Sequence, residues 1–291
     1  MPSPTLRRRR LSRLLYALRE ERGLTAKAVA AQAKERSGRV RGWSESKLNR
    51  LESGEWKRAK VDDIATLLDI YGITDPAERE AYFVLAREAG QQGWWASYGD
   101  ALGSGQFVGL ETEARSIRTC EMMAIPGLLQ TEDYARAIIQ ASTAAVGDPL
   151  DERDLDRRVE ARMLRKSILL GRNDPPTYWA VIGEAALLHI TPCLKGQLKY
   201  LLEMGERANI GIQVLPVSRG PHAAMTGQFV ILDFLAPDPP VVYLEALSEE
   251  IYLETPDEIR RYQQIYSHVQ AEALPVGDSR AFIRSRLSEL Q

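Results

Sequence analysis

Apolar positions near the start of the chain recur at the spacing of amphipathic helices. The first stripe consists of Leu11, Leu14, Leu15 and Leu18. Gly23 ends this helix, and Thr25 is a candidate N-cap for a short second helix rich in alanine. A later stripe predicts a helix that ends at Gly72, and Asp75-Pro76 has the composition of a further helix start. With the third helix described next, five helices are expected in this part of the chain.

The third predicted helix has an apolar side and a polar side that are clearly separated. Ser44 can cap it, Leu48 and Leu51 face inward, and Gly54 ends it. The side chains expected on its outer face are Glu45, Ser46, Lys47, Asn49 and Arg50. Arginine can bind guanine through two hydrogen bonds, asparagine can bind adenine, and serine or lysine can contact bases or phosphates. The face is therefore a candidate for the major groove of DNA, with a solvated polar surface as the alternative.

Further basic residues surround this helix. We expect a long turn over residues 34–42, and its candidates for phosphate contact are Lys34, Arg36, Arg39 and Arg41. At the start of the second helix, Thr25 and Lys27 are also candidates for DNA contact. The basic run 7–10 is either an arm that contacts phosphates or the minor groove, or a solvated helix start.

The pattern changes in the second part of the chain. A connection rich in glycine and tryptophan covers residues 91–97, and residues 98–171 are expected to be mostly helical, with a long helix at about 151–170. Strands are predicted at 178–182, 210–217, 227–234, 241–246 and 250–254, and helices at 194–207, 256–273 and 278–290. We therefore expect an all-α domain over 1–90 and an α+β domain over 98–291, with a central mixed sheet flanked by helices.

The charge distribution supports this division. The net charge of the 291-residue chain is only −2. Residues 1–60 carry 17 Lys and Arg against 6 Asp and Glu, a balance of +11, whereas the rest of the chain carries 21 against 34, a balance of −13. A basic module on an acidic body concentrates the attraction for a polyanion at one end. A disordered basic arm would produce the same imbalance, but the helical pattern disfavours it.

Two strings in the first module carry a family resemblance. The run from Leu18 to Thr25 (LREERGLT) and the run from Leu48 to Gly54 (LNRLESG) resemble the phage-repressor-like helix-turn-helix family, also called XRE. The resemblance implies a five-helix DNA-binding domain and a structural ion pair between Arg19 and Glu52. The chain departs from the family at Ala26, where a glutamine that touches the DNA backbone is common.

The second module resembles another family, the C-terminal domain common in actinomycete helix-turn-helix regulators of the WhiJ kind. The residues that carry this resemblance are 93–95, 126–135, 160–162, 214–216, 227–234 and 242–245, including the run Pro-Gly-Leu-Leu-Gln-Thr. Such regulators are often encoded beside a small partner protein, in an arrangement like that of an antitoxin and its toxin. The resemblance implies that this domain senses or binds something.

The sequence contains no converging set of catalytic groups, so we expect no enzyme, no cofactor and no metal site. His222, in a Gly-Pro loop, is the most suggestive residue for a ligand pocket, with Glu184 and Glu245 as companions. An exposed loop histidine and ion-paired glutamates are the alternatives. The two cysteines, Cys120 and Cys193, match no zinc motif and are expected to be reduced thiols.

These observations favour a transcription regulator that binds double-stranded DNA, as a homodimer on a palindromic operator. The alternative is an antitoxin-like protein whose C-terminal domain binds a small protein from a neighbouring gene, with autoregulatory DNA binding. No apolar run is long enough to span a bilayer, and no signal-peptide segment follows the basic start. We expect a cytoplasmic protein associated with the nucleoid.

Overall fold

The computed structural model describes residues 3–37, 42–144, 150–171, 173–189, 192–246 and 249–290. The chain forms two compact units, Met1–Ala96 and Ser97–Gln291, and the division between them falls inside the segment 91–97. No helix among the described residues is both long enough and apolar enough to cross a bilayer.

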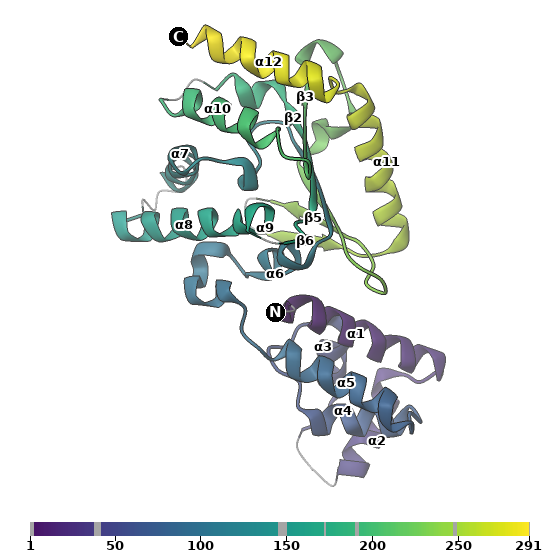
Figure 1. The fold of residues 1–291 in the computed structure, drawn as a ribbon. Helices are drawn as coiled ribbons and strands as arrows, with labels where there is room; N and C mark the ends of the chain where they lie inside the picture. Colours follow the sequence, from purple (N-terminus) through teal and green to yellow (C-terminus); the bar gives the residue numbers. More distant parts are fainter. Residues whose placement is uncertain are drawn as a thin grey trace. The chain divides into compact units, whose positions relative to one another are not determined.

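The described residues of the first unit form the five expected helices (Figure 1). These are α1 (Pro4–Glu21), α2 (Ala26–Ser37), α3 (Glu45–Ser53), α4 (Val61–Ile70) and α5 (Pro76–Ala89). The predicted caps form. The Ser44 hydroxyl accepts a hydrogen bond from the Lys47 backbone amide at 3.1 Å, and the Asp75 carboxylate accepts one from the Glu78 amide at 2.7 Å. The all-α fold predicted for this module is confirmed.

Of the two alternatives for residues 7–10, the structure supports the helix start and excludes the arm, because the four residues lie inside α1. Arg7 forms an ion pair with Glu88 at 3.0 Å, which fixes this segment on α5. One local prediction about this unit is wrong: the turn predicted over 34–42 is too long, because α2 continues to Ser37. Lysine, glutamate and arginine are good helix formers, so the polar residues 34–36 extend the helix and do not end it.

Tyr71 lies at the centre of this unit's core and provides a stability test. The residue is completely buried, and its hydroxyl has no hydrogen-bond partner among the described residues. Burial raises the pKa of Tyr71, since it disfavours the phenolate.

We expect Tyr71→Phe to raise the free energy of unfolding by about 1 kcal/mol, because an unpaired buried hydroxyl costs desolvation energy. Urea unfolding of the full chain measures this. Tyr266→Phe is the matched control. The Tyr266 hydroxyl donates to the Trp179 carbonyl at 3.0 Å, so loss of this hydroxyl should lower the free energy of unfolding. A destabilised Tyr71→Phe variant would contradict the assignment.

The second unit is built on one mixed sheet of six described strands. They are β1 (Ser116–Glu121), β2 (Thr177–Gly183), β3 (Ile210–Leu215), β4 (Phe229–Asp233), β5 (Val241–Glu245) and β6 (Glu250–Leu253). Their order is β3-β2-β1-β4-β5-β6. β1, β2 and β3 are parallel, whereas β4, β5 and β6 join by antiparallel pairing. The predicted mixed sheet flanked by helices is confirmed.

The strand β1 corrects the prediction that residues 98–171 are mostly helical. It lies between β2 and β4, and Ile117 and Cys120 are buried on its opposite faces. Its sequence, SIRTCE, is short and polar, so the local pattern gave no strand signal strong enough to stand out between helices. Pairing with β2 on one side and β4 on the other stabilises β1 as a strand, although its own sequence has little strand propensity.

Helices cover both faces of the sheet, as Figure 1 shows. On one side lie α7 (Glu132–Ala144), α8 (Glu152–Arg165) and α10 (Leu194–Met204), and α11 (Pro256–Glu272) lies on the other. The remaining α-helices among the described residues are α6 (Gln106–Glu113), the short α9 (Ser167–Leu170) and α12 (Val276–Glu289). The single helix predicted at 151–170 is therefore two helices, α8 and α9.

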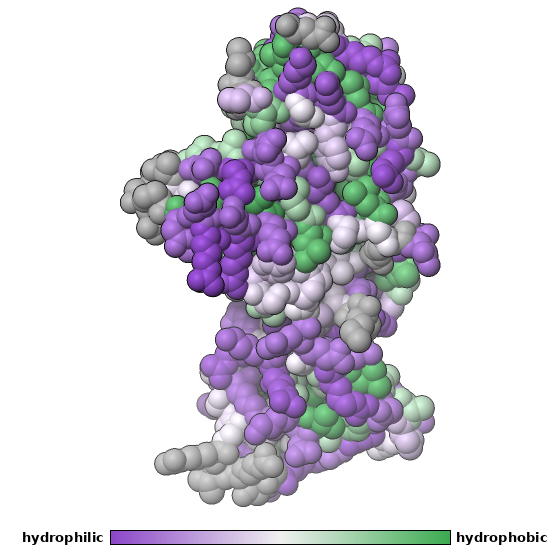
Figure 2. All heavy atoms as spheres, turned by 60° about the vertical axis from the view of Figure 1, so that its left-hand side comes forward, coloured by the Kyte–Doolittle hydropathy of each residue, from purple (hydrophilic) through white to green (hydrophobic). Residues whose placement is uncertain are grey.

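The outer side of α8 is polar. Leu155 and Val159 face inward, whereas most of the acidic and arginine residues in the first part of the helix are exposed. Figure 2 shows a strongly hydrophilic patch where α7 and α8 project from the body. The inner side of α8 packs against α7, because Leu155 and Val159 form one apolar cluster with Ile139.

Candidate nucleic-acid interface

The polar face of α3 forms one continuous surface. Ser44, Glu45, Ser46, Asn49 and Arg50 are all exposed. Together with Ser53 and Glu55 they line an open hollow along the helix. The inner side is fixed, because Leu48 is fully buried and Leu51 is 5% exposed. This arrangement exposes side chains that can hydrogen-bond to base edges on a short helix, an element of the size that fits a major groove.

The ion pair that the family resemblance implies between Arg19 and Glu52 is present in the structure. The Arg19 Nε lies 2.8 Å from Glu52 Oε1 and 3.0 Å from Oε2, and its Nη1 donates to the Leu24 carbonyl at 2.8 Å. The side chains are only 11% and 5% exposed. Hydrogen bonding to Glu52 raises the pKa of Arg19 above its ordinary value. One guanidinium thus connects the end of α1, the turn into α2 and the last turn of α3.

Lys47 is placed differently from its neighbours on α3. It is half-buried, its Nζ lies 2.8 Å from Asp63 Oδ2, and the same atom sits 4.2 Å from the centre of the Trp43 ring. These contacts join α3 to α4 and to the segment before α3. Lys47 is therefore engaged inside the domain, although the sequence pattern placed it on the outer face.

The other sequence-predicted residues of the interface lie on α2 or just before it. The Thr25 hydroxyl accepts a hydrogen bond from the Ala28 amide at 3.2 Å, as an N-cap does. Lys27 is exposed on the first turn of α2, and Lys34 and Arg36 are exposed on its last turns. Arg39 and Arg41 lie outside the described residues.

The segment after α3 contains three exposed basic residues that the sequence interpretation missed. They are Lys57, Arg58 and Lys60. Trp56 holds this segment in place, because its indole N–H contacts the Ser12 hydroxyl at 3.0 Å and its carbonyl accepts from Arg8 at 3.0 Å. A cluster of basic residues that begins three positions after Gly54 was the available signal. Its position beside α3 makes it a phosphate-contact candidate.

The three residues suggested for a ligand pocket lie near the same end of the sheet but do not touch. The Glu184 carboxylate accepts from the Val217 amide at 2.8 Å. His222 has a buried Nδ1 without a hydrogen-bond partner among the described residues. Glu245 is exposed at the end of β5. No contact between described residues joins the three into a single pocket.

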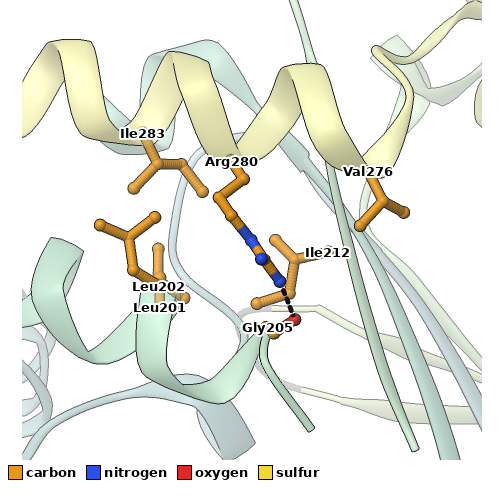
Figure 3. A pocket seen from close by; sticks show the side chains of 7 residues that line it. All are labelled: Leu201, Leu202, Gly205, Ile212, Val276, Arg280 and Ile283. Atoms are coloured by element: carbon orange, nitrogen blue, oxygen red, sulfur yellow. Dashed lines mark hydrogen bonds between the residues drawn. The ribbon is translucent and has the colours of Figure 1, made fainter. Parts of the chain in front are cut away.

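A separate hollow lies between α10 and α12, as Figure 3 shows. It is lined by Leu201, Leu202, Gly205, Ile212, Val276, Arg280 and Ile283. Arg280 spans it and donates to the Gly205 carbonyl at 2.6 Å. The cavity of about 10 Å³ holds at most one water molecule. It is a packing defect between two helices and is too small for a metabolite.

Comparison with known families matches both units. Residues 10–82 match a family described as a helix-turn-helix domain, and residues 104–285 match one described as a domain of unknown function, DUF5753. The first match indicates DNA binding and, with it, transcription regulation. No curated protein and no solved structure matches this sequence.

Proposed function

Because this chain belongs to the DUF5753 family and carries a helix-turn-helix domain, we propose that it is a sequence-specific DNA-binding regulator of transcription. The observation that supports this most is the exposed row Ser44, Glu45, Ser46, Asn49 and Arg50 on α3. This row belongs to the basic part of a chain that is otherwise acidic. The groups proposed to read bases therefore lie in the same unit as the positive charge that attracts phosphates.

The interface divides into residues that read bases and residues that hold the backbone. Asn49 and Arg50 carry the groups that form paired hydrogen bonds with adenine and guanine. Lys27, Lys34 and Arg36 on α2 contact phosphates, with Arg39 and Arg41 beyond them. Lys47 orients α3 through Asp63, and its role is to position the helix.

We propose that the protein acts as a homodimer. Helix-turn-helix dimers meet half-sites about one helical turn, roughly 34–36 Å, apart, so the operator should be a palindrome. Footprinting the protein on the DNA upstream of its own gene tests the regulator and the dimer together. A symmetric protected region with two half-sites supports both. Protection of a single half-site would contradict the dimer and indicate a regulator that binds as a monomer. Equal affinity for unrelated DNA would refute the sequence-specific function.

The segment after α3 leads to a prediction on salt dependence. We expect Lys57→Ala to weaken binding to all DNA sequences alike and to reduce the slope of log affinity against log salt by about one, since each phosphate contact releases counterions. Mobility-shift titrations over a salt series measure the slope. Lys195→Ala, an exposed lysine of the C-terminal unit, is the control and should leave it unchanged. An unchanged slope for Lys57→Ala would exclude the contact.

A second candidate function concerns a protein partner. The residues after 60 carry 34 acidic against 21 basic residues, which favours a basic partner. In this alternative the C-terminal domain binds a small protein encoded beside this one, as an antitoxin does, and DNA binding is autoregulatory. Co-purification of the tagged chain with the product of the adjacent gene supports it. If that product elutes separately at high concentration of both proteins, the alternative fails.

A further inference from the structure

The exposed row on α3 carries a negative charge at its first residue. Glu45 begins α3, is exposed, and lines the same hollow as Asn49 and Arg50. Residues 1–60 contain 6 Asp and Glu against 17 Lys and Arg, and two of those acidic residues, Glu45 and Glu55, line this hollow. DNA phosphates repel a carboxylate, so a carboxylate in a surface that faces DNA lowers the affinity unless it makes a favourable contact there.

The Glu45 carboxylate is not engaged within the described part of the chain. No lysine or arginine of that part lies within ion-pair distance of it, and Lys47, two residues further along α3, is bound to Asp63 at 2.8 Å. The helix cap does not use Glu45 either, because the Ser44 hydroxyl accepts the hydrogen bond from the Lys47 amide. Both carboxylate oxygens of Glu45 can therefore accept hydrogen bonds from a bound molecule.

The position of Glu45 in the helix favours contact with bases. In helix-turn-helix complexes the first residues of the recognition helix contact base edges in the major groove. Glu45 and Asn49 are four residues apart and share one face of α3. A helix rises about 1.5 Å per residue and successive bases of one strand are about 3.4 Å apart. A helix lying along the groove therefore brings these two side chains to bases about two steps apart.

A carboxylate distinguishes the four bases by the groups that they present in the major groove. It can only accept hydrogen bonds, and cytosine presents the N4 amino group, which is a donor. Guanine presents two acceptors and thymine presents one, so both repel a carboxylate. Adenine presents a donor beside an acceptor, and that acceptor would face the second carboxylate oxygen. Cytosine is thus the base that suits a carboxylate best.

We infer that Glu45 determines base choice in the operator by accepting a hydrogen bond from the N4 amino group of a cytosine. Each half-site then contains a cytosine about two positions from the adenine that Asn49 reads. The charge of Glu45 also weakens binding to sequences without this cytosine, so part of the specificity comes from repulsion of wrong sequences. The inference rests on the sequence-specific DNA binding proposed above, and it names one base of the operator.

Selection from a pool of randomised DNA duplexes by the full chain tests this assignment. The parent should enrich a motif with a strongly preferred cytosine. Glu45→Gln should change that preference to adenine and leave the rest of the motif as it is, because an amide matches adenine N6 and N7. A parent that enriches no motif would refute the sequence-specific function and the inference with it. A parent motif that Glu45→Gln leaves unchanged would overturn the inference alone.

Titrations with four duplexes that differ only at this base pair measure the size of the effect. The parent should bind the cytosine duplex about tenfold more tightly than the other three. Glu45→Gln should bind the adenine duplex most tightly, and its affinity for unrelated DNA should rise because a charge of the same sign as the phosphates is removed. Equal affinities of the parent for the four duplexes would contradict the role of Glu45.

Glu55→Gln is the matched control. Glu55 is exposed and lines the same hollow, but it follows Gly54, the residue that ends α3. Its neutralisation should strengthen binding to all sequences alike and leave the preferred bases of the parent unchanged. If Glu45→Gln has this same effect, both carboxylates act only by repulsion of phosphates, and the contact with cytosine is excluded.

A purely structural role of Glu45 has a different signature. A carboxylate in the first turn stabilises a helix through the helix dipole, and Glu45 is in the first turn of α3. If Glu45 acted only in this way, Glu45→Gln would weaken binding to the four duplexes by the same factor. That result would overturn the inference, whereas a change in the order of the four affinities supports it.

Discussion

Replacing Glu52 with alanine is expected to lower the free energy of unfolding of the helix-turn-helix unit by about 3–5 kcal/mol. The variant leaves the Arg19 guanidinium, which is 11% exposed, without the carboxylate that it contacts through Nε. A buried charge that loses its buried partner is costly, and the remaining carboxylate contact, from the exposed Glu20, compensates it only in part. The same loss detaches the end of α3 from α1, so DNA binding should fall as well.

Urea unfolding of the full chain, followed by tryptophan fluorescence, measures the effect, since Trp43 and Trp56 belong to this unit. Glu20→Ala is the matched control. Glu20 also contacts Arg19, at 2.7 Å, but is 53% exposed, so its loss should cost less than about 1 kcal/mol. The double variant Arg19→Met, Glu52→Leu should recover most of the stability, because it removes both charges. Equal losses of unfolding free energy for Glu52→Ala and Glu20→Ala would show that burial of the carboxylate does not determine the strength of its ion pair with Arg19.

Arg50→Ala should reduce affinity for the operator by about 1–3 kcal/mol and relax the base preference at one position of each half-site. Arg50 is exposed and lies in the same row as Asn49, on a helix whose inner side is anchored by Leu48 and Leu51. Removal of a bidentate guanine contact costs affinity only where guanine is present. The fold should be unaffected, since no packing of the core is lost.

Titrations against the operator and against single-base variants of it measure this effect. The comparator is Arg58→Ala, which removes a positive charge from the segment after α3 and should weaken all sequences alike. If Arg50→Ala also weakens all sequences equally, Arg50 is a phosphate contact and another residue of the row reads the base. Asn49→Ala is then the next variant to measure.

The local sequence was sufficient for the helices of the first unit. Ser44 and Asp75 form the caps that their chemistry predicts, and the buried Leu48 and Leu51 lie where the helical period puts them. The strands β2 to β6 were also recognised, since apolar runs between turn residues are local signals. Side-chain hydrogen bonds to the next few residues and the period of a helix or strand act over short distances along the chain, so they can be inferred without a fold.

The candidate site was only partly accessible in this way. The helical period predicts the exposed row on α3. It also places Lys47 in that row, but in the structure Lys47 is bound to Asp63, which is sixteen residues away in sequence. Likewise Glu184, His222 and Glu245 were candidates from their places beside strands and loops, but no contact between described residues joins them into one pocket.

By itself, then, the sequence determined the all-α module, its capped recognition helix, the charge difference between the two parts and the α+β class of the second. The tertiary structure decided that residues 116–121 are a strand between β2 and β4, and that α2 continues to Ser37. The reason is that a short polar strand such as β1 is stabilised by pairing with β2 and β4, segments more than fifty residues away. Strand propensity depends on such neighbours, whereas a helix cap carries its own partners within one turn.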